Sequence, residues 1–291
     1  MIAQFIFNQL VDSKKSKSTI EKFFKLCREY LLKKEDPIIN FTFQGYKIKI
    51  HLSHYLPIIL NEHPNYNQNL ADISQKLFIK YPDLKIIDVG ANIGDSVVMI
   101  RSKVEVPILC IEGNPKFLDL LKHNTKNISD IYLADYFVGE ESDNVLPINR
   151  IGTAHLIKAN EEGIAVKTMR KVIEEFDIFA NSKLLKIDTD GYDNKIIRGS
   201  KEFLIYSKAA VFFEYDPYFL SKQEELGFDI FDFFVSLNYR KFIIFDNIGE
   251  KLITLTYQNR SQFLELHSYF NQGGKKYMDI LALHEEDFDL I

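Results

Sequence analysis

From Lys85 onward short apolar segments alternate with helical stretches, and this alternation is the strongest constraint on the fold. Such a pattern is typical of a mostly parallel sheet that is covered by helices on both faces. Ligands of such sheets bind beyond the carboxyl ends of the strands, so the residues that follow each strand are the first candidates for a site. Seven strands are predicted, at Lys85–Val89, Ile108–Ile111, Ile131–Ala134, Leu184–Ile187, Ala210–Phe213, Lys241–Phe245 and Met278–Leu283.

Upstream of this alternation the pattern predicts an extension made of helices and a hairpin. A helix is expected over about Thr19–Lys33, with an apolar face that suits either the core or a homodimer contact. Period-two alternation over Phe41–Leu52 predicts a hairpin, and a second helix is expected over Asn69–Lys80. We therefore divide the chain into the extension, residues 1–80, and a main domain, residues 81–291.

Composition and charge exclude several classes of protein. The chain has 46% hydrophobic residues, which suffices for a packed core, and its net charge of −5 argues against a surface tuned to nucleic acid. No stretch of about 18 apolar residues occurs, so no membrane span is expected. Cys27 and Cys110 form neither a metal motif nor a disulfide framework. We expect a cytoplasmic protein without a nucleic-acid partner.

The segment Asp88–Asp95, with the sequence D-V-G-A-N-I-G-D, is the most informative stretch. Gly90 and Gly94 let the backbone pass close to a ligand, and Asn92 tolerates the left-handed conformation that a further glycine would otherwise supply. Glu112 ends the next strand, where an acid commonly accepts hydrogen bonds from ribose hydroxyls. These residues predict a site for a cofactor that contains a nucleoside.

The charges at this loop discriminate between two such cofactors. A dinucleotide rests its pyrophosphate on the backbone of a G-x-G-x-x-G loop, but here Asn92 and Asp95 replace two of the glycines and Asp88 precedes the loop. Carboxylates repel a pyrophosphate, whereas they favour the sulfonium and ammonium groups of S-adenosylmethionine. The sequence therefore predicts S-adenosylmethionine as the cofactor, with an NAD-dependent oxidoreductase as the alternative.

Four motifs in this order resemble the FkbM family of S-adenosylmethionine-dependent methyltransferases. They are D-V-G-A-N-I-G-D at 88–95, I-E-G-N-P at 111–115, L-L-K-I-D-T-D-G-Y-D at 184–193 and F-F-E-Y-D-P at 212–217, and the match also includes Tyr66-Asn67 and Asp279–Ala282. The resemblance implies an α/β, Rossmann-like class I methyltransferase fold, with a seven-stranded, mostly parallel sheet whose last strand is antiparallel. It also implies methylation of hydroxyls on sugars, glycans or polyketide-type metabolites.

Acidic residues after the fourth and fifth strands are the candidates for acting on the acceptor. Asp188 and Asp190 follow the fourth strand and Glu214 ends the fifth, so we expect them at one edge of the sheet. A hydroxyl is a poor nucleophile until it loses its proton, so a positioned base is expected. Capping of the helix that begins near Tyr192 is the alternative role for Asp188 or Asp190. Two acids without a nearby His are too few ligands for a metal site to be predicted.

Two further predictions concern the region between the third and fourth strands. His155 is expected in a loop over the site, as a base or as a solvated side chain, and Phe137 and Val138 are expected beside the adenine or in the core. The predicted cofactor-binding residues are Asp88, Gly90, Asn92, Gly94, Asp95, Glu112, Phe137 and Val138, and the predicted catalytic residues are Asp188, Asp190, Glu214 and His155.

The predicted function is O-methylation of a sugar hydroxyl, on a small-molecule or glycan acceptor, in glycan or secondary-metabolite biosynthesis. A cofactor-binding scaffold protein without turnover is a second alternative, from a different class.

Overall fold

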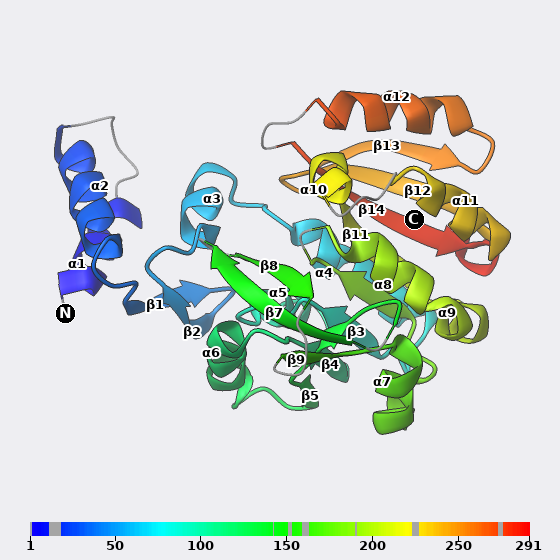
Figure 1. The fold of residues 1–291 in the computed structure, drawn as a ribbon, viewed down its shortest axis with the longest axis horizontal. Coiled ribbons are helices and arrows are strands. Elements are labelled where there is room, and N and C mark those ends of the chain that lie inside the picture. Colours follow the sequence, from blue (N-terminus) through cyan, green and yellow to red (C-terminus); the bar gives the residue numbers. More distant parts are fainter. Residues whose placement is uncertain are drawn as a thin grey trace.

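The computed structural model describes residues 2–11, 19–141, 143–150, 153–158, 163–189, 191–222, 227–272 and 276–291. A large mixed sheet with helices packed on it forms the centre of the molecule (Figure 1). Its strands are β3 (Ile86–Val89), β4 (Ile108–Ile111), β5 (Ile131–Ala134), β10 (Leu184–Ile187), β11 (Ala210–Tyr215), β12 (Tyr239–Asp246), β13 (Lys251–Thr256) and β14 (Met278–His284). Their order is β13-β12-β14-β11-β10-β3-β4-β5, which confirms the predicted α/β fold.

All seven predicted strands are present. Neighbouring strands run parallel across β5, β4, β3, β10 and β11. The last strand, β14, is antiparallel to both of its neighbours. The predicted count of seven is wrong by one, because β13 adds an eighth strand that pairs with β12 as an edge hairpin. The Asp246 carboxylate accepts hydrogen bonds from the backbone N–H groups of Ile248 and Glu250 and so closes this turn.

A second sheet occupies the region where the sequence predicted a loop. It contains β6 (Phe137–Val138), β7 (Asp143–Arg150), β8 (Thr153–Lys158) and β9 (Ile164–Lys167), in the order β6-β9-β7-β8. β7 and β8 form an antiparallel hairpin in which His155 pairs with Ile148. The prediction of a loop at His155 is therefore wrong, and the side chain of His155 lies outside the described residues.

The described helices are α1 (Ile2–Val11), α2 (Thr19–Leu32), α3 (Leu56–Glu62), α4 (Gln68–Lys80), α5 (Asp95–Arg101), α6 (Pro115–Thr125), α7 (Met169–Glu175), α8 (Asp193–Gly199), α9 (Lys201–Ser207), α10 (Pro217–Lys222), α11 (Asp229–Ser236) and α12 (Arg260–Phe270). Helices α4 to α12 contribute to the cores on the two faces of the large sheet, whereas α1, α2 and α3 lie with the N-terminal hairpin. Successive residues of a strand face opposite sides of the sheet. Phe213 belongs to the same buried cluster as Phe234 of α11, whereas Phe212 belongs to the same cluster as Leu77 of α4. Among the described residues no helix has the length and apolar character needed to cross a membrane.

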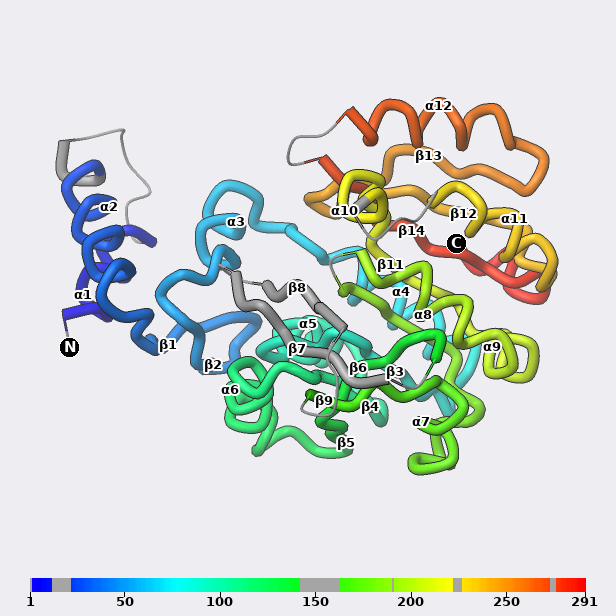
Figure 2. The backbone as a smooth tube through the Cα atoms, viewed as in Figure 1, coloured from blue at the N-terminus to red at the C-terminus, as the bar shows by residue number. Residues whose placement is uncertain are grey.

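Helices α1 and α2, drawn in blue, lie at one end of the molecule, far from the C-terminal strands (Figure 2). The last helix of the extension, α4, packs against β12 and β14. The predicted hairpin is present as β1 (Ile38–Phe43) and β2 (Tyr46–His51). Gln44 and Gly45 both have positive φ angles, which a two-residue hairpin turn of type I′ requires. Ile48 of this hairpin is buried in the same cluster as Val98 of α5 and Phe117 of α6, so the extension shares a core with the main domain.

The two helices predicted in the extension are confirmed as α2 and α4, whereas α1 and α3 were not predicted. The ring of Phe24 on α2 meets Phe5 of α1 edge to face at 5.9 Å. The apolar face of α2 is therefore partly covered by the chain itself.

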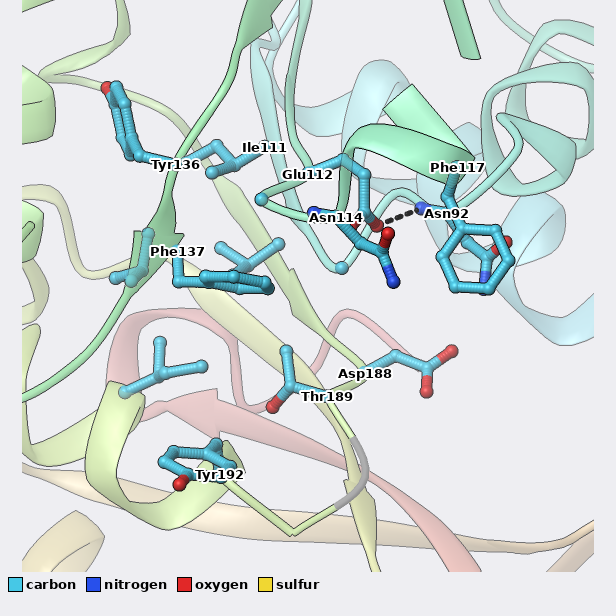
Figure 3. A pocket seen from close by; sticks show the side chains of 15 residues that line it. Asn92, Ile111, Glu112, Asn114, Phe117, Tyr136, Phe137, Asp188, Thr189 and Tyr192 are labelled. Carbon is cyan, nitrogen blue, oxygen red and sulfur yellow. Dashed lines mark hydrogen bonds between the residues drawn. The ribbon is translucent and has the colours of Figure 1, made fainter. Parts of the chain in front are cut away.

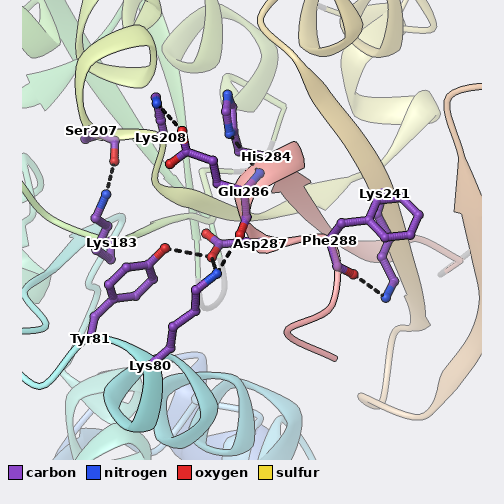
Figure 4. Close-up of polar contacts among 10 residues, drawn as sticks. All are labelled: Lys80, Tyr81, Lys183, Ser207, Lys208, Lys241, His284, Glu286, Asp287 and Phe288. Atoms are coloured by element: carbon purple, nitrogen blue, oxygen red, sulfur yellow. Dashed lines mark hydrogen bonds and ion pairs between the residues drawn. The ribbon is translucent and has the colours of Figure 1, made fainter.

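A polar cluster fastens the C-terminal segment to the end of α4 (Figure 4). The Asp287 carboxylate is buried and accepts hydrogen bonds from Lys80 Nζ at 2.5 Å and from Tyr81 Oη at 2.7 Å. Asp287→Ala should lower the free energy of unfolding by about 2–3 kcal/mol, because it removes the acceptor of the Tyr81 hydroxyl and the charge partner of Lys80, which keeps its hydrogen bond to the carbonyl of Glu286. Urea unfolding measures this loss. Asp232→Ala is the control, since Asp232 pairs with Arg260 on the surface, and an equal loss there would contradict the account.

Candidate functional site

Two adjoining pockets lie at the carboxyl ends of β3, β4 and β10. The first has a volume of about 590 Å³ and the second of about 1280 Å³, both including their open mouths. They share Gly90, Asn92 and Asp188 as lining residues. The first pocket falls within the volume typical of small-molecule sites, and the second exceeds it. Two ligands that bound side by side would therefore meet at Asp188.

The loop after β3 has a backbone that a side chain at its first glycine would disrupt. Gly90 has φ +78°, and a Cβ built there would lie 2.0 Å from the backbone oxygen of Asp188. Asn92 has φ +47°, which confirms the predicted left-handed conformation. Gly94 has φ +86° and packs against Leu121 of α6 rather than lining either pocket. The loop therefore passes as close to β10 as the backbone permits.

The Glu112 carboxylate ties together two loops that border the first pocket (Figure 3). Its Oε2 accepts a hydrogen bond from the backbone N–H of Asn92 at 2.9 Å, and its Oε1 accepts one from the N–H of Asn114 at 2.7 Å. Burial raises the pKa of Glu112 to about 7, although both hydrogen bonds oppose this shift. Each oxygen keeps a further lone pair with which it is able to accept a hydroxyl of a ligand.

Aromatic and apolar side chains form the opposite part of the first pocket. The ring of Phe137 lies against Gly113, where a Cβ would come within 2.5 Å of Phe137 Cγ, and Figure 3 shows this ring pointing toward Asn114. Val138 lines the pocket and also belongs to the core. Tyr136 is buried, and its hydroxyl donates to Glu175 at 3.3 Å. Such a slot suits a flat, partly polar ring system.

A buried lysine lines the second pocket. Lys186 Nζ lies 3.0 Å from Asp88 Oδ1 and 3.5 Å from Asp188 Oδ2, and it donates to the carbonyl of Gly90. Burial disfavours its charge, but the two carboxylates outweigh this effect and raise the pKa of Lys186. Asp88 also accepts a hydrogen bond from Ser96 and is fully buried. Asp88 therefore lies beneath the loop and lines neither pocket.

Three acids line the second pocket from neighbouring strands. Asp188 follows β10, Glu214 lies in β11, and Asp279 lies opposite Glu214 in β14. The side chain of Asp188 is 50% exposed, whereas Asp279 is only 8% exposed. Burial raises the pKa of Asp279 well above its ordinary value, and the charge of Asp188 adds to the shift. Tyr66 and Tyr277, which are hydrogen-bonded to each other, line the same pocket.

Asp95 begins α5 and lines the second pocket together with His54. Burial raises the pKa of Asp95, and the neighbouring His54 opposes this shift. Burial lowers the pKa of His54, and Asp95 in turn opposes that shift. This part of the pocket therefore presents a carboxyl group beside an imidazole.

Asp188 does not cap the helix α8 that begins after Tyr192. The first turn of α8 has no side-chain cap at Tyr192, and the carboxylate of Asp193 instead accepts hydrogen bonds from Thr189 Oγ1 and the N–H of Gly191. Asp188 contacts Lys186 rather than the helix. Asp190 lies outside the described residues. Within the described part of the chain, no three His, Cys, Asp or Glu side chains stand close enough to hold a metal ion.

Several lining residues of the second pocket were not predicted from the sequence. Lys186 precedes Asp188 by two positions, and the period-two alternation of a strand was the available signal that both share a face. Asp279 and Tyr66 lie in motifs that carry the family resemblance, without any local indication of their role. Nothing in the local sequence distinguishes His54, which reaches the pocket from the extension.

Comparisons with known proteins agree with this geometry. The model of the methyltransferase FkbM domain matches residues 88–241, more than half of the chain. Among solved structures, the chain is similar to a methyltransferase FkbM from Methylobacillus flagellatus KT, with 13% identity and a TM-score of 0.36; the match covers 95% of this chain and 58% of that one. No curated protein matches the chain.

Two further solved structures are similar to the chain at a comparable level. TYW2 from M. jannaschii in complex with AdoMet has 10% identity and a TM-score of 0.41, and the match covers 85% of this chain and 86% of that one. An O-methyltransferase from Bacillus cereus in complex with SAH has 10% identity and a TM-score of 0.40, and the match covers 73% of this chain and 80% of that one.

The assignment rests on the family match, which includes the Gly90 loop, Glu112, Asp188 and Glu214. The fold is that of a class I methyltransferase, with β14 inserted antiparallel between β11 and β12. The chain belongs to the FkbM family of S-adenosylmethionine-dependent methyltransferases.

Proposed function

We propose that the chain transfers the methyl group of S-adenosylmethionine to a sugar hydroxyl, on a glycan or small-molecule acceptor, in glycan or secondary-metabolite biosynthesis. The second pocket carries this proposal, because it adjoins the first at Asp188 and has a wall of carboxylates and tyrosines. Both kinds of group form hydrogen bonds with sugar hydroxyls. We also propose that the protein is cytosolic and that it forms a homodimer through the extension.

The cofactor fits the first pocket in chemistry and in space. Glu112 would accept the ribose hydroxyls, Phe137 and Val138 would contact the adenine, and the Gly90 and Asn92 backbone would border the remainder. The absence of a side chain at Gly90 lets the loop approach the backbone of Asp188, which lines the same pocket. Asp95, on the side of the second pocket, is a carboxyl group that a cationic ligand would favour in its charged form. Asp88 and Gly94 would act indirectly, by shaping the loop from beneath. When bound, S-adenosylmethionine supplies a methyl group that is already activated by its positive sulfur.

Asp188 is the proposed base for the acceptor hydroxyl. It lies where the two pockets adjoin, is half exposed, and is held by the buried Lys186 at 3.5 Å. A carboxylate so placed is able to accept the hydroxyl proton as the oxygen attacks the methyl group. Glu214, Asp190 and His155 are the further candidates for this role.

We also propose that the chain divides into the extension, residues 1–80, and the methyltransferase domain, residues 81–291. We propose that the extension completes the acceptor site, since it supplies His54 and Tyr66 to the wall of the second pocket.

A transfer assay with labelled S-adenosylmethionine tests the proposed reaction. Free sugars, nucleotide sugars and glycan intermediates are offered as acceptors, and the methylated atom is identified by NMR. We expect label on a sugar oxygen. Transfer only to nitrogen or carbon would contradict the proposal, as would the absence of transfer to every sugar while another class of acceptor is methylated.

Glu112→Ala should weaken the binding of S-adenosylhomocysteine by about 2–4 kcal/mol, because two charge-assisted hydrogen bonds to the ribose are lost. The pKa of Glu112 in the ligand-free protein is about 7, and the ribose hydroxyls favour the carboxylate. Affinity in the wild type should therefore fall as the pH drops below 7, by up to about tenfold per pH unit. Calorimetry between pH 5.5 and 8 measures both effects. Glu112→Gln is the control, and a pH profile that it leaves unchanged would exclude Glu112 as the titrating group.

A further inference from the structure

A buried carboxyl group lies in the wall of the second pocket. Asp279 is 8% exposed and lines this pocket. Its backbone pairs within the sheet, but no hydrogen bond or ion pair joins its carboxyl group to a residue that the structure describes. Burial raises the pKa of Asp279, so the neutral form of its carboxyl group is favoured in the ligand-free protein. A cationic group of a ligand would oppose this shift, because it stabilises the carboxylate. The position therefore suits a cationic group from outside the chain.

The cationic side chain of strand β10, Lys186, already forms ion pairs with other carboxylates. Lys186 is held by Asp88 at 3.0 Å and by Asp188 at 3.5 Å, so its one positive charge faces two carboxylates. Glu214 lies directly opposite Asp279 in the sheet and adds a further acid. The described side chains at this end of the pocket therefore include more carboxyl groups than cationic groups, which disfavours a phosphate or carboxylate and favours an ammonium group.

Two tyrosines complete the surroundings of Asp279. Tyr66 and Tyr277 line the same pocket as Asp279, and the carboxylate of Asp279 adds to the rise that burial causes in the pKa of Tyr66. Burial likewise raises the pKa of Tyr277, with Asp279 among the further causes. Aromatic rings attract cations at their faces, so a carboxylate beside two tyrosines is suited to an ammonium group.

We propose that the second pocket binds an acceptor that carries an ammonium group, as an amino sugar does, and that Asp279 is its counter-charge. The inference rests on the proposed methylation of a sugar hydroxyl. β14 lies two strands from β10, about 10 Å away at the usual strand spacing. Asp279 therefore holds the acceptor at a group remote from the hydroxyl that meets Asp188, and acts as a specificity-determining residue.

Binding of three matched sugars to the protein saturated with S-adenosylhomocysteine tests this proposal. Glucosamine carries the ammonium group, whereas glucose and N-acetylglucosamine are neutral. Glucosamine should bind about tenfold or more tightly than either neutral sugar, in line with a charge-assisted contact. Asp279→Asn should remove this preference, Tyr277→Phe should keep it because the ring remains, and Asp279→Glu should retain at least part of it.

Asp72→Asn is the matched control, because Asp72 pairs with Lys103 at the surface and should leave the preference unchanged. Binding of S-adenosylhomocysteine by each variant shows that it is folded. Equal binding of the three sugars to the wild type would overturn the proposal, as would a preference for glucosamine that survives in Asp279→Asn. If neutral sugars are methylated without any such preference, only the ammonium proposal fails. If the preference holds but no sugar oxygen is methylated, the proposed function fails instead.

Discussion

Gly90→Ala should lower the free energy of unfolding by about 2–5 kcal/mol, from a left-handed backbone and a steric overlap together. The added Cβ would lie 2.0 Å from the backbone oxygen of Asp188, so the loop or the end of β10 must move. Either movement displaces Asn92 and Asp188, which line both pockets. Turnover should therefore fall on the order of a hundredfold, as expected for small misplacements at a reacting centre.

Gly45→Ala is the matched control for this variant. Gly45 has φ +82°, close to the +78° of Gly90, but a Cβ there would meet no atom within 4 Å. This variant should lose only about 1–2 kcal/mol from the backbone term and keep full affinity for S-adenosylhomocysteine. Urea unfolding and calorimetry on both variants separate the two effects. Equal losses of stability and affinity would show that the close approach to Asp188 is unimportant.

Asp188→Asn should reduce turnover on the order of a hundredfold or more, since it keeps the shape of the side chain and removes its basicity. The free energy of unfolding should change by less than about 1 kcal/mol, because the side chain is half exposed and Lys186 retains Asp88. Affinity for S-adenosylhomocysteine should change far less than turnover. Single-turnover kinetics with the acceptor found in the transfer assay measure the chemical step.

Asp193→Asn is the contrasting variant. The carboxylate of Asp193 is buried and accepts hydrogen bonds from Thr189 and Gly191, so this change should mainly lower stability. Wild-type turnover in Asp188→Asn would assign the proton transfer to another group, with Glu214, Asp190 and His155 next in order. Activity that a chelator abolishes and magnesium restores would add a metal ion to the site.

The inner strands of the large sheet were predictable because they are short, mostly apolar runs buried on both faces, as Ile108–Ile111 shows. The edge strand β13 was missed because Leu252 and Ile253 are 50% and 40% exposed, so its burial pattern differs from that of the inner strands. The hairpin of β7 and β8 was missed because it belongs to a separate sheet that the strand–helix alternation does not anticipate.

Some residues of the candidate site were likewise predictable from the sequence, and others were not. The geometry of Gly90 and Asn92 follows from a single loop and was predictable, as was the position of Glu112 at a strand end. The pairing of Lys186 with Asp88 depends on two strands separated by almost a hundred residues. The meeting of His54, Tyr66 and Asp279 depends on how the extension packs on the sheet, which local sequence patterns do not determine.

Thermal unfolding with S-adenosylhomocysteine and with NAD tests the central claim most directly. A ligand that binds only the folded chain at a hundred times its Kd stabilises it by about 2.7 kcal/mol. S-adenosylhomocysteine should raise the melting temperature of the wild type and much less that of Glu112→Ala, whereas NAD should leave both unchanged. Stabilisation by NAD with no response to S-adenosylhomocysteine would contradict the assignment of the first pocket to the methyl donor.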